Sequence, residues 1–466
     1  MRGLHWFRND LRLRDNTSLN ALIAQVDEWL PVFVIDRGLL QGPRAGAPRT
    51  RFLLDCLARL GRDLERRGIP MLVLEGRAED VLPRLMHKVG AQILSFNEDT
   101  TPYARRRDDD VVRAVERAGG RVLSRSDRVV FDSSEIRTRG GTAYSVYSPY
   151  RRAWWKRWRE EPRVPSGPGR LAPPIPRFKA GRIPDARRFG LVDIECDLPT
   201  GGETAARRRL SKFLESAAGR YHLDRDRPAV DGTARLSPYL RFGAISVREC
   251  FAQALGVVAS RPRLRAGVGK WLDELVWREF YSAILAEHPR VLTESYRSEY
   301  RSLAWSEDPA GFDAWCEGRT GYPFVDAGMR QLRKTGWMHN RVRMVVASFL
   351  TKDLLIDWRK GERYFFERLV DGDPASNNGG WQWAASTGTD PQPYFRIFNP
   401  VLQGKRWDPD GRYVRRWIPE LRGVPDAIVH SPWLGDLPYD YPAPIVDHAV
   451  RHGMSFDLFQ EAREAS

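Results

Sequence analysis

The chain has 466 residues, of which 42% are hydrophobic, and 75 Lys and Arg against 60 Asp and Glu give a net charge of +15. No apolar run has the length of a membrane span or a signal peptide, so a membrane partner is excluded and a cytoplasmic location is expected. The positive charge favours a polyanion such as nucleic acid, with an arginine-rich composition and no polyanionic partner as the competing interpretation.

The length indicates two domains, and the two parts of the chain differ in their pattern of predicted strands and helices. Up to about residue 130, the runs "RGLHWF", "WLPVFVID", "PMLVLEG" and "AQILSFN" alternate with helical patterns such as "RTRFLLDCLARLGRDLERRG". This alternation predicts an α/β domain over 1–130 with a Rossmann-like parallel sheet. Prolines and glycines cluster over 162–200, and we assign 131–202 to an interdomain connector. Long helical periodicities predict an all-α domain over 203–466.

The four cysteines, Cys56, Cys196, Cys250 and Cys316, lie far apart and form no C-x-x-C pair. This spacing argues against a zinc site and against a disulfide framework, so reduced and mostly buried thiols are expected. Nucleotide fingerprints are also missing. No G-x-G-x-x-G follows a strand, and Gly269-Lys270 is followed by Trp271, which does not fit a P-loop.

The segment "WLDELVWREFY" places Trp271, Glu274 and Arg278 on one helix face, with Trp277 on its flank. One interpretation is an ordinary Glu-to-Arg pair beside core tryptophans. The other is a carboxylate between two aromatic rings, which suits a site that reads the polar edge of a flat ligand. The segment alone leaves both open.

A second predicted helix, "GWMHNRVRMVVASFL", carries Asn340 and Met344 four residues apart, with Arg341 and Arg343 near the same turn. Methionine is more often a gap filler than a contact residue, and asparagine is more often solvated. This helix does not identify a site by itself.

Three longer segments carry a family resemblance: "WFRNDLRLRDN" at 6–16, "TGYPFVDAGMRQL" at 320–332 and "DGDPASNNGGWQWAASTGTDPQPYFRIFNP" at 371–400. Together with the two helices above, they resemble the photolyase and cryptochrome family over essentially the whole chain. The resemblance implies an N-terminal α/β domain, a long connector, and a helical domain that binds FAD in a U-shaped conformation.

The resemblance also implies a set of cofactor residues. They are Tyr221, Thr233, Ala234, Arg235, Leu236, Ser237, Trp271, Glu274, Arg278, Asn340, Arg343, Asp371, Asp373 and Asn377. Ala234 stands where the family often has a serine, so one hydroxyl contact is missing and a backbone N–H or a water would replace it. Asn377 corresponds to the residue that faces flavin N5.

The pair Asp371 and Asp373 is explained by the same resemblance. One matches the salt-bridge partner of Arg343 and the other a flavin contact, so neither is an unpaired buried charge. Gly379 and Gly380 are expected to turn the chain tightly past the flavin. Two aspartates without further ligands supply too few oxygens for calcium, so no metal is expected.

Three tryptophans, Trp305, Trp358 and Trp381, match the family's electron-transfer chain. Trp277 and Trp383 match the two walls of the substrate pocket, where stacking on an extruded base pair offsets about 1–3 kcal/mol per base.

The pocket residues resemble those of class I cyclobutane pyrimidine dimer photolyases. Glu274 would hydrogen-bond the pyrimidine edge, Asn340 a polar base atom, and Met344 would pack against the dimer, whereas enzymes for the six-four photoproduct have a histidine in place of Asn340. The implied activity is that of a deoxyribodipyrimidine photo-lyase, in which excited reduced FAD donates an electron to a flipped-out dimer. A blue-light receptor of the same fold is the competing class.

UV-damaged DNA is the expected partner, bound through Trp277, Arg341, Trp383 and Arg396, by a monomer without an obligatory protein partner. The basic run at 151–163 has two open interpretations: a DNA-facing surface, or a connector helix that docks Trp154, Trp155 and Trp158 into the protein.

A second, antenna chromophore is less determined. Tyr103-Ala104 stands in "TTPYARRRD", where folate-binding relatives have Asn-Glu. This favours a deazaflavin or flavin antenna over methenyltetrahydrofolate and leaves open that none is bound.

Overall fold

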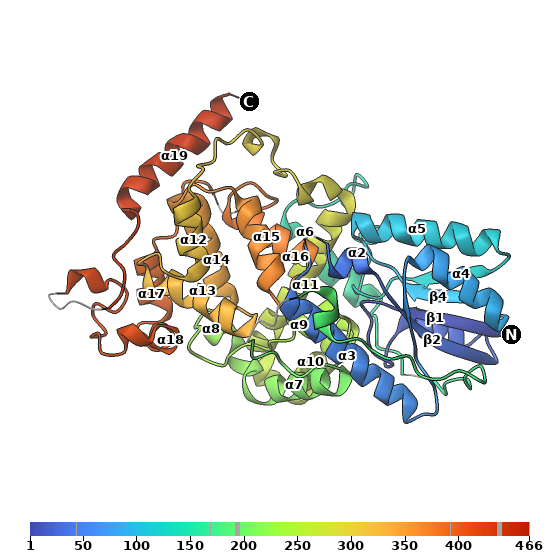
Figure 1. Cartoon of the computed structure of the whole chain (residues 1–466). Coiled ribbons are helices and arrows are strands. Elements are labelled where there is room, and N and C mark those ends of the chain that lie inside the picture. Colours follow the sequence, from blue (N-terminus) through green and yellow to red (C-terminus); the bar gives the residue numbers. More distant parts are fainter. Residues whose placement is uncertain (43, 168, 192–195, 392, 436–439, 466) are drawn as a thin grey trace. The chain divides into compact units, whose positions relative to one another are not determined.

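The computed structural model describes residues 1–42, 44–167, 169–191, 196–391, 393–435 and 440–465 (Figure 1). The connector predicted over 131–202 therefore lies partly outside the described residues. The chain divides into two compact units. Unit 1 comprises Met1–Ile194, Pro199–Arg220 and Ala234–Pro289, and unit 2 comprises Glu195–Leu198, Tyr221–Thr233 and Arg290–Ser466.

Unit 1 contains a five-stranded, fully parallel sheet with the strand order β3-β2-β1-β4-β5. The strands are β1 (Arg2–Phe7), β2 (Glu28–Ile35), β3 (Leu72–Glu75), β4 (Ile93–Asn97) and β5 (Arg121–Arg125). The order reverses at β1, as in other doubly wound sheets. This confirms the α/β prediction and adds β5, which was not predicted.

Helices cover both faces of this sheet. They are α1 (Thr17–Ile23), α2 (Arg37–Leu40), α3 (Ala47–Glu65), α4 (Ala78–Val89) and α5 (Pro102–Arg117). Figure 1 shows α4 and α5 along one face and α3 along the other. Leu4 packs with Leu82 and Val111 on the first face, whereas the neighbouring Gly3 lies directly against Leu22 on the second. The near-continuous apolar strands reflect burial on both sides.

Five further helices belong to unit 1: α6 (Tyr147–Glu160), α7 (Glu203–Ser216), α9 (Ser237–Arg241), α10 (Val247–Ser260) and α11 (Arg265–Glu287). The longest, α11, packs against α6 and α10. Twelve of its residues are buried on several sides, so it is a core helix rather than an amphipathic surface helix.

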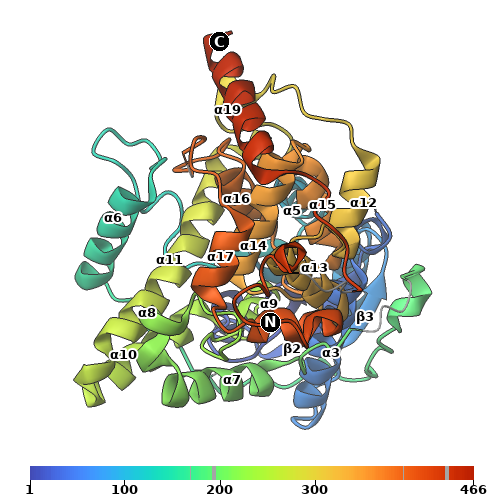
Figure 2. The same cartoon turned by 90° about the vertical axis from the view of Figure 1, so that its left-hand side faces the viewer.

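Unit 2 is helical. It contains α8 (Tyr221–Asp224), α12 (Pro309–Glu317), α13 (Pro323–Thr335), α14 (Asn340–Ser348), α15 (Trp358–Arg368), α16 (Pro374–Ala384), α17 (Pro400–Trp407), α18 (Arg412–Trp417) and α19 (His448–Glu464). A single π-helical turn, Phe349–Asp353, continues α14. Figure 2 shows α14 and α16 side by side, and their packing together with α15 forms the centre of the apolar core.

The Asn-Asn-Gly-Gly segment corrects one expectation. Gly379 and Gly380 do not form a turn but lie inside α16, and neither has a positive φ. The helix begins here because the Asp373 side chain accepts from the amides of Ala375 and Ser376, and because Pro374 is well suited to the first helical position.

The cysteine prediction is confirmed in its main point. All four thiols are free, with Cys56 and Cys250 buried and the other two partly exposed. Burial raises the pKa of Cys56 to about 12, so this thiol is un-ionised at neutral pH. Within the described part of the chain, no helix is both long and apolar enough to cross a membrane.

Candidate functional site

The predicted site residues fall in both units. Unit 1 holds Ala234, Arg235, Leu236, Ser237, Trp271, Glu274, Trp277 and Arg278, and unit 2 holds the remainder.

In unit 1 the predicted helix face is formed by α11. Trp271 is buried with its ring centroid 5.1 Å from that of Phe213, whereas Glu274 and Arg278 are half-buried. Lys270 Nζ lies 3.7 Å from Glu274 Oε1, and Arg278 donates to the backbone carbonyl of Arg128 at 2.6 Å. The Arg278 guanidinium therefore also fixes the loop that follows β5.

Trp277 is half-buried and stacks on Tyr147 of α6. The ring centroids are 3.6 Å apart and the planes differ by 10°. The Tyr147 hydroxyl donates to the carbonyl of Asp273 at 2.7 Å. Tyr147 was not among the predicted residues, because nothing in its local sequence connects it to a residue 130 positions further along the chain.

Helix α6 docks against the protein through its tryptophans, as one of the two interpretations of the basic run at 151–163 predicted. Trp154 and Trp158 are buried, and Trp155 Nε1 donates to Asp273 Oδ1 at 3.1 Å. Three basic side chains of the same helix, Arg152, Lys156 and Arg159, are exposed.

In unit 2, α14 carries Asn340 and Met344, two of the predicted substrate residues. Asn340 is exposed at the first turn, and its Nδ2 lies 3.8 Å from the Met344 sulfur. Arg343 forms the expected ion pair, with Asp371 Oδ2 at 2.9 Å and Oδ1 at 3.1 Å. Arg343 Nη2 thus contacts both carboxylate oxygens of Asp371, at the start of the segment that leads into α16.

Arg341 is more constrained than expected of a phosphate contact. Its guanidinium lies 3.0 Å from Asp226 Oδ1 and 4.8 Å from the Trp407 ring centroid. By contrast, the Arg396 side chain is exposed.

The buried Asn377 side chain is held by α15. Its Nδ2 donates to the backbone carbonyl of Glu362 at 3.0 Å and to the Glu362 carboxylate at 2.9 Å. Because the amide nitrogen is used, the Oδ1 acceptor is directed away from Glu362. Glu362 was also not predicted, because it lies in the charged run "RKGERYFFER", where nothing in the local sequence distinguishes it from its charged neighbours.

The three tryptophans of the predicted chain differ in exposure. Trp381 and Trp358 are buried, and Trp305 is half-buried with its ring 6.1 Å from that of Phe459 in α19. A Cβ on Gly361 would lie 2.1 Å from Trp381 Cη2, so this glycine is needed for the close approach of α15 to α16. Trp383 is half-buried and lies 6.4 Å from Phe398 between ring centroids.

The remaining predicted residues belong to short segments. Tyr221 lies in α8, Thr233 and Ala234 precede α9, and Ser237 is its first residue. Arg235 adopts a left-handed φ of 48°. Ala234 and Leu236 are buried, whereas Arg235 and Ser237 are exposed.

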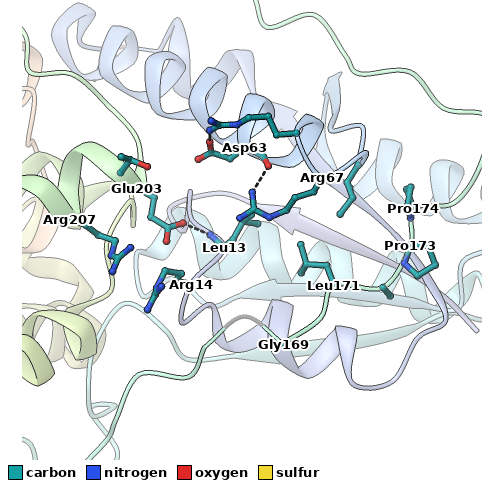
Figure 3. Close-up of a pocket in the computed structure, with 14 residues that line it drawn as sticks. Leu13, Arg14, Asp63, Arg67, Gly169, Leu171, Pro173, Pro174, Glu203 and Arg207 are labelled. Atoms are coloured by element: carbon teal, nitrogen blue, oxygen red, sulfur yellow. Dashed lines mark hydrogen bonds and ion pairs between the residues drawn. The ribbon is translucent and has the colours of Figure 1, made fainter.

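A separate cavity of about 960 Å³ lies within unit 1 (Figure 3) and contains none of the predicted site residues. Its wall includes Arg14, Arg67 and Arg207, with Glu203 accepting from the Leu13 amide at 2.9 Å. Among the described residues, no group of three or more His, Cys, Asp or Glu side chains is arranged to hold a metal ion.

Comparisons with known proteins agree with this architecture. The family model described as DNA photolyase matches residues 3–168, and the model of the FAD-binding domain of DNA photolyase matches residues 271–461. The helical part is therefore the FAD-binding domain of that family.

Full-length relatives are similarly consistent. The chain is 40% identical to the deoxyribodipyrimidine photo-lyase of Halobacterium salinarum, over 99% of both chains. It is 39% identical to that of Escherichia coli, again over 99% of both, and 39% identical to that of Synechococcus sp., over 99% of this chain and 97% of the relative.

Solved structures give the same result. A class III photolyase from Agrobacterium tumefaciens matches with a TM-score of 0.91 and 35% identity, covering 99% of this chain and 98% of the other. An archaeal photolyase from Sulfolobus tokodaii with two FAD molecules matches with a TM-score of 0.83 and 33% identity, covering 99% and 100%. A Synechocystis cryptochrome matches with a TM-score of 0.89 and 28% identity, covering 98% and 99%. With relatives this similar over its full length, the chain belongs to the DNA photolyase family.

Proposed function

We propose that this protein repairs cyclobutane pyrimidine dimers in DNA by light-driven electron transfer from reduced FAD. The observation that carries the proposal is the full-length identity of 39–40% to three enzymes named deoxyribodipyrimidine photo-lyase. The net charge of +15 supports a polyanionic substrate.

The residues of unit 2 fit a bound flavin. Asn377 is nine-tenths buried, its Nδ2 is fixed on Glu362, and its Oδ1 is therefore an acceptor suited to the N5–H of a reduced ring. The Arg343–Asp371 pair compensates the charge of Asp371, a further proposed cofactor residue. When bound, FAD in its reduced and excited form supplies the electron that splits the dimer and regains it afterwards.

Five side chains are the proposed substrate contacts. Glu274 accepts or donates at the pyrimidine edge, Asn340 binds a polar base atom, and Met344 packs on the dimer. Trp277 and Trp383 provide the stacking surfaces for an extruded base pair. The half-buried state of all but the exposed Asn340 is compatible with side chains that must meet a ligand.

Trp381, Trp358 and Trp305 are proposed to carry the electrons that reduce oxidised flavin. Two are buried and the third is half-buried, as expected of a path that ends at the surface. The indole nitrogens of Trp381 and Trp358 have no hydrogen-bond partner among the described residues.

For the second chromophore, we retain a deazaflavin or flavin as the proposal. The Tyr103 hydroxyl donates to Asp36, and Arg107 lies 5.9 Å from the Tyr103 ring centroid. The absorption spectrum of the chromophores released from purified protein would distinguish deazaflavin, flavin, folate and FAD alone.

The deciding experiment uses UV-irradiated oligo(dT) and the reduced protein, in blue light and in the dark. Light-dependent recovery of thymine absorbance is expected, and Glu274→Ala should lower its quantum yield with FAD content unchanged. Glu287→Ala is a matched control on the same helix, because Glu287 pairs with Arg137 instead. Flavin photoreduction without repair would assign the protein to the receptor class.

A further inference from the structure

We infer that Tyr147 is a positioning residue that fixes the indole of Trp277 for dimer recognition, and that α6 acts as a brace for this purpose. The inference rests on the proposed function, in which Trp277 walls the substrate pocket. It adds a residue from the segment assigned to the interdomain connector to the determinants of damage specificity.

The rings of Tyr147 and Trp277 are closer together and more nearly parallel than aromatic pairs usually are. Isolated aromatic pairs prefer offset or edge-to-face arrangements with centroids about 4.5–7 Å apart. Tyr147 and Trp277 are instead nearly parallel at 3.6 Å. Such a close, face-to-face pair requires support from its surroundings, so the stack is imposed by the fold rather than formed by the two rings alone.

That support is visible on both sides of the pair. The Tyr147 hydroxyl donates to the carbonyl of Asp273 at 2.7 Å, four residues before Trp277 on α11. Phe280 meets both rings edge-on, at 5.8 Å from Tyr147 and 5.6 Å from Trp277. Tyr147 is 7% exposed, so its position has little freedom.

The register of α6 on α11 is fixed by a stripe of residues. Tyr147, Arg151 and Trp155 are spaced by four residues and share one face of α6. All three reach Asp273: Arg151 Nε lies 2.7 Å and Trp155 Nε1 3.1 Å from its Oδ1. Figure 2 shows α6 beside α11, and the three contacts with Asp273 fix the position of α6 along α11.

A second contact locks the rotation of α6. Trp154 Nε1 donates to the buried carboxyl group of Glu279 at 2.7 Å. Glu279 is two residues after Trp277, so the contacts at Asp273 and Glu279 bracket the indole along α11. Helix α6 can therefore neither slide nor turn without moving Tyr147 away from Trp277.

The contact between Tyr147 and Trp277 should affect the binding of damaged DNA and not the repair reaction itself. Tyr147 covers one face of the Trp277 indole, so a dimer can use only the other face or the edge. A ring already held in one orientation loses less rotamer entropy when a base pair stacks on it. The brace should therefore strengthen binding of damaged DNA and leave both undamaged-DNA binding and turnover at saturation unchanged.

The test compares Tyr147→Met, which fills the space without a ring, with Tyr147→Phe, which keeps the stack. Dissociation constants are measured for DNA with and without a single dimer, together with the repair quantum yield at saturation. Tyr147→Met should weaken binding of dimer DNA about 2- to 12-fold, the range of one aromatic pair. Tyr147→Phe should change it less than about 2-fold, because Phe280 and the contacts of Arg151 and Trp155 with Asp273 still hold the ring in place.

Tyr150→Met is the matched control, because Tyr150 is a buried tyrosine of the same helix whose ring meets Phe280 at 5.3 Å and not Trp277. It should affect stability but not the ratio of the two dissociation constants. A loss of discrimination equal to that of Tyr147→Met would overturn the inference.

A double-mutant cycle with Trp277→Ala separates the inference from the proposed function. In the Trp277→Ala background, Tyr147→Met should have no further effect on dimer binding, whereas additive losses would contradict coupling. If Trp277→Ala itself leaves dimer binding intact, the proposed role of Trp277 fails. If Trp277→Ala weakens dimer binding and Tyr147→Met does not, only the inference fails.

If Tyr147→Met does not fold, Tyr147→Phe is the deciding variant. A loss of dimer affinity above about 3-fold in Tyr147→Phe would assign the effect to the hydroxyl group and not to the stacked ring, and would overturn the inference.

Discussion

Asn377 and Glu362 form a buried pair in which one amide nitrogen of Asn377 serves two acceptors of Glu362, the backbone carbonyl at 3.0 Å and the carboxylate at 2.9 Å. The two residues belong to adjacent helices, α16 and α15. The pair fixes which end of the Asn377 amide faces away from α15, and this orientation is what the proposed flavin contact requires.

Replacing Glu362 by alanine should loosen that orientation. Removing one partner of a buried hydrogen bond costs about 1–3 kcal/mol, and we expect the reduced flavin of Glu362→Ala to reoxidise in air at least about 5-fold faster. The rate is followed by flavin absorbance after photoreduction. Glu362→Gln keeps a side-chain acceptor and should stay close to wild type, and identical rates in all three proteins would remove Glu362 from the flavin site.

Trp381→Phe should prevent photoreduction of oxidised FAD while leaving repair by chemically reduced protein largely intact. The reason is that phenylalanine is far harder to oxidise than tryptophan. Trp315→Phe is the control: Trp315 is equally buried and lies 6.0 Å from Trp381, but it is not in the proposed chain. Photoreduction at the wild-type rate in Trp381→Phe would exclude the assigned path.

The contact between Gly361 and Trp381 makes a further prediction. A Cβ at this position would lie 2.1 Å from Trp381 Cη2 and 2.5 Å from Leu350 Cδ2, so Gly361→Ala should overpack the α15–α16 interface and destabilise the protein by about 1–3 kcal/mol. Urea unfolding measures this. Gly380→Ala provides the contrast, since its added Cβ meets nothing within 4 Å and alanine favours the helix by about 1 kcal/mol. Equal stability of the two variants would contradict the packing argument.

The parts of the fold that could be predicted are those with a strong local signal. Strands β1 to β4 are mostly apolar, whereas β5 has only Val122 and Leu123 between arginine and serine at an edge, too short a pattern to recognise. The glycine pair at 379–380 suggested a turn, but the cap at Asp373 and the proline after it start a helix instead.

The candidate site could be proposed because its motifs are long and contiguous, whereas the residues that support it have no such motif. Glu362, Gly361 and Tyr147 act through contacts with residues 15, 20 and 130 positions away, and such contacts leave no periodicity in a single sequence. Arg341 is a different case. Its position suggests a phosphate contact, and the structure adds an ion pair with Asp226 that the sequence did not indicate.

Two arginines with different surroundings should therefore respond differently to mutation. Arg396 is exposed, and Arg396→Ala should lower the dependence of DNA affinity on log salt by about one unit of slope, uniformly for damaged and undamaged DNA. Arg341 is paired with Asp226, so Arg341→Ala should reduce stability and leave the salt slope nearly unchanged. Titrations at several salt concentrations test both, and a reduced slope in Arg341→Ala alone would reverse the assignment.

The raised pKa of Glu279 predicts how the free energy of unfolding depends on pH. Burial raises the pKa of this carboxyl group from an ordinary 4.5 to about 7, although it accepts from Val130 N and Trp154 Nε1. The folded state therefore holds a proton that the unfolded state releases at lower pH. This contribution to stability is complete below about pH 4.5 and is lost as the pH rises through 7, with a slope of at most about 1.4 kcal/mol per pH unit.

Other titratable groups also contribute to the pH dependence of stability. Burial also raises the pKa of Asp408 to about 6, so a part of the slope between pH 5 and 7 belongs to Asp408. Asp127 is buried too, but Arg12 and Arg248 hold its pKa below the ordinary value, so its contribution is lost only in more acidic solution. The window from pH 5 to 7 thus contains the contributions of Glu279 and Asp408, together with an opposing one from His430, whose pKa is lowered by burial.

Glu279→Gln should remove the larger part of that slope. Its amide nitrogen would face a donor, so the variant is expected to be less stable than wild type at pH 5 and closer to it at pH 8, because the wild type alone loses stability on ionisation. Denaturant unfolding at pH 5, 6, 7 and 8 gives the free energies of unfolding. A constant difference between variant and wild type across this range would show that Glu279 does not titrate there.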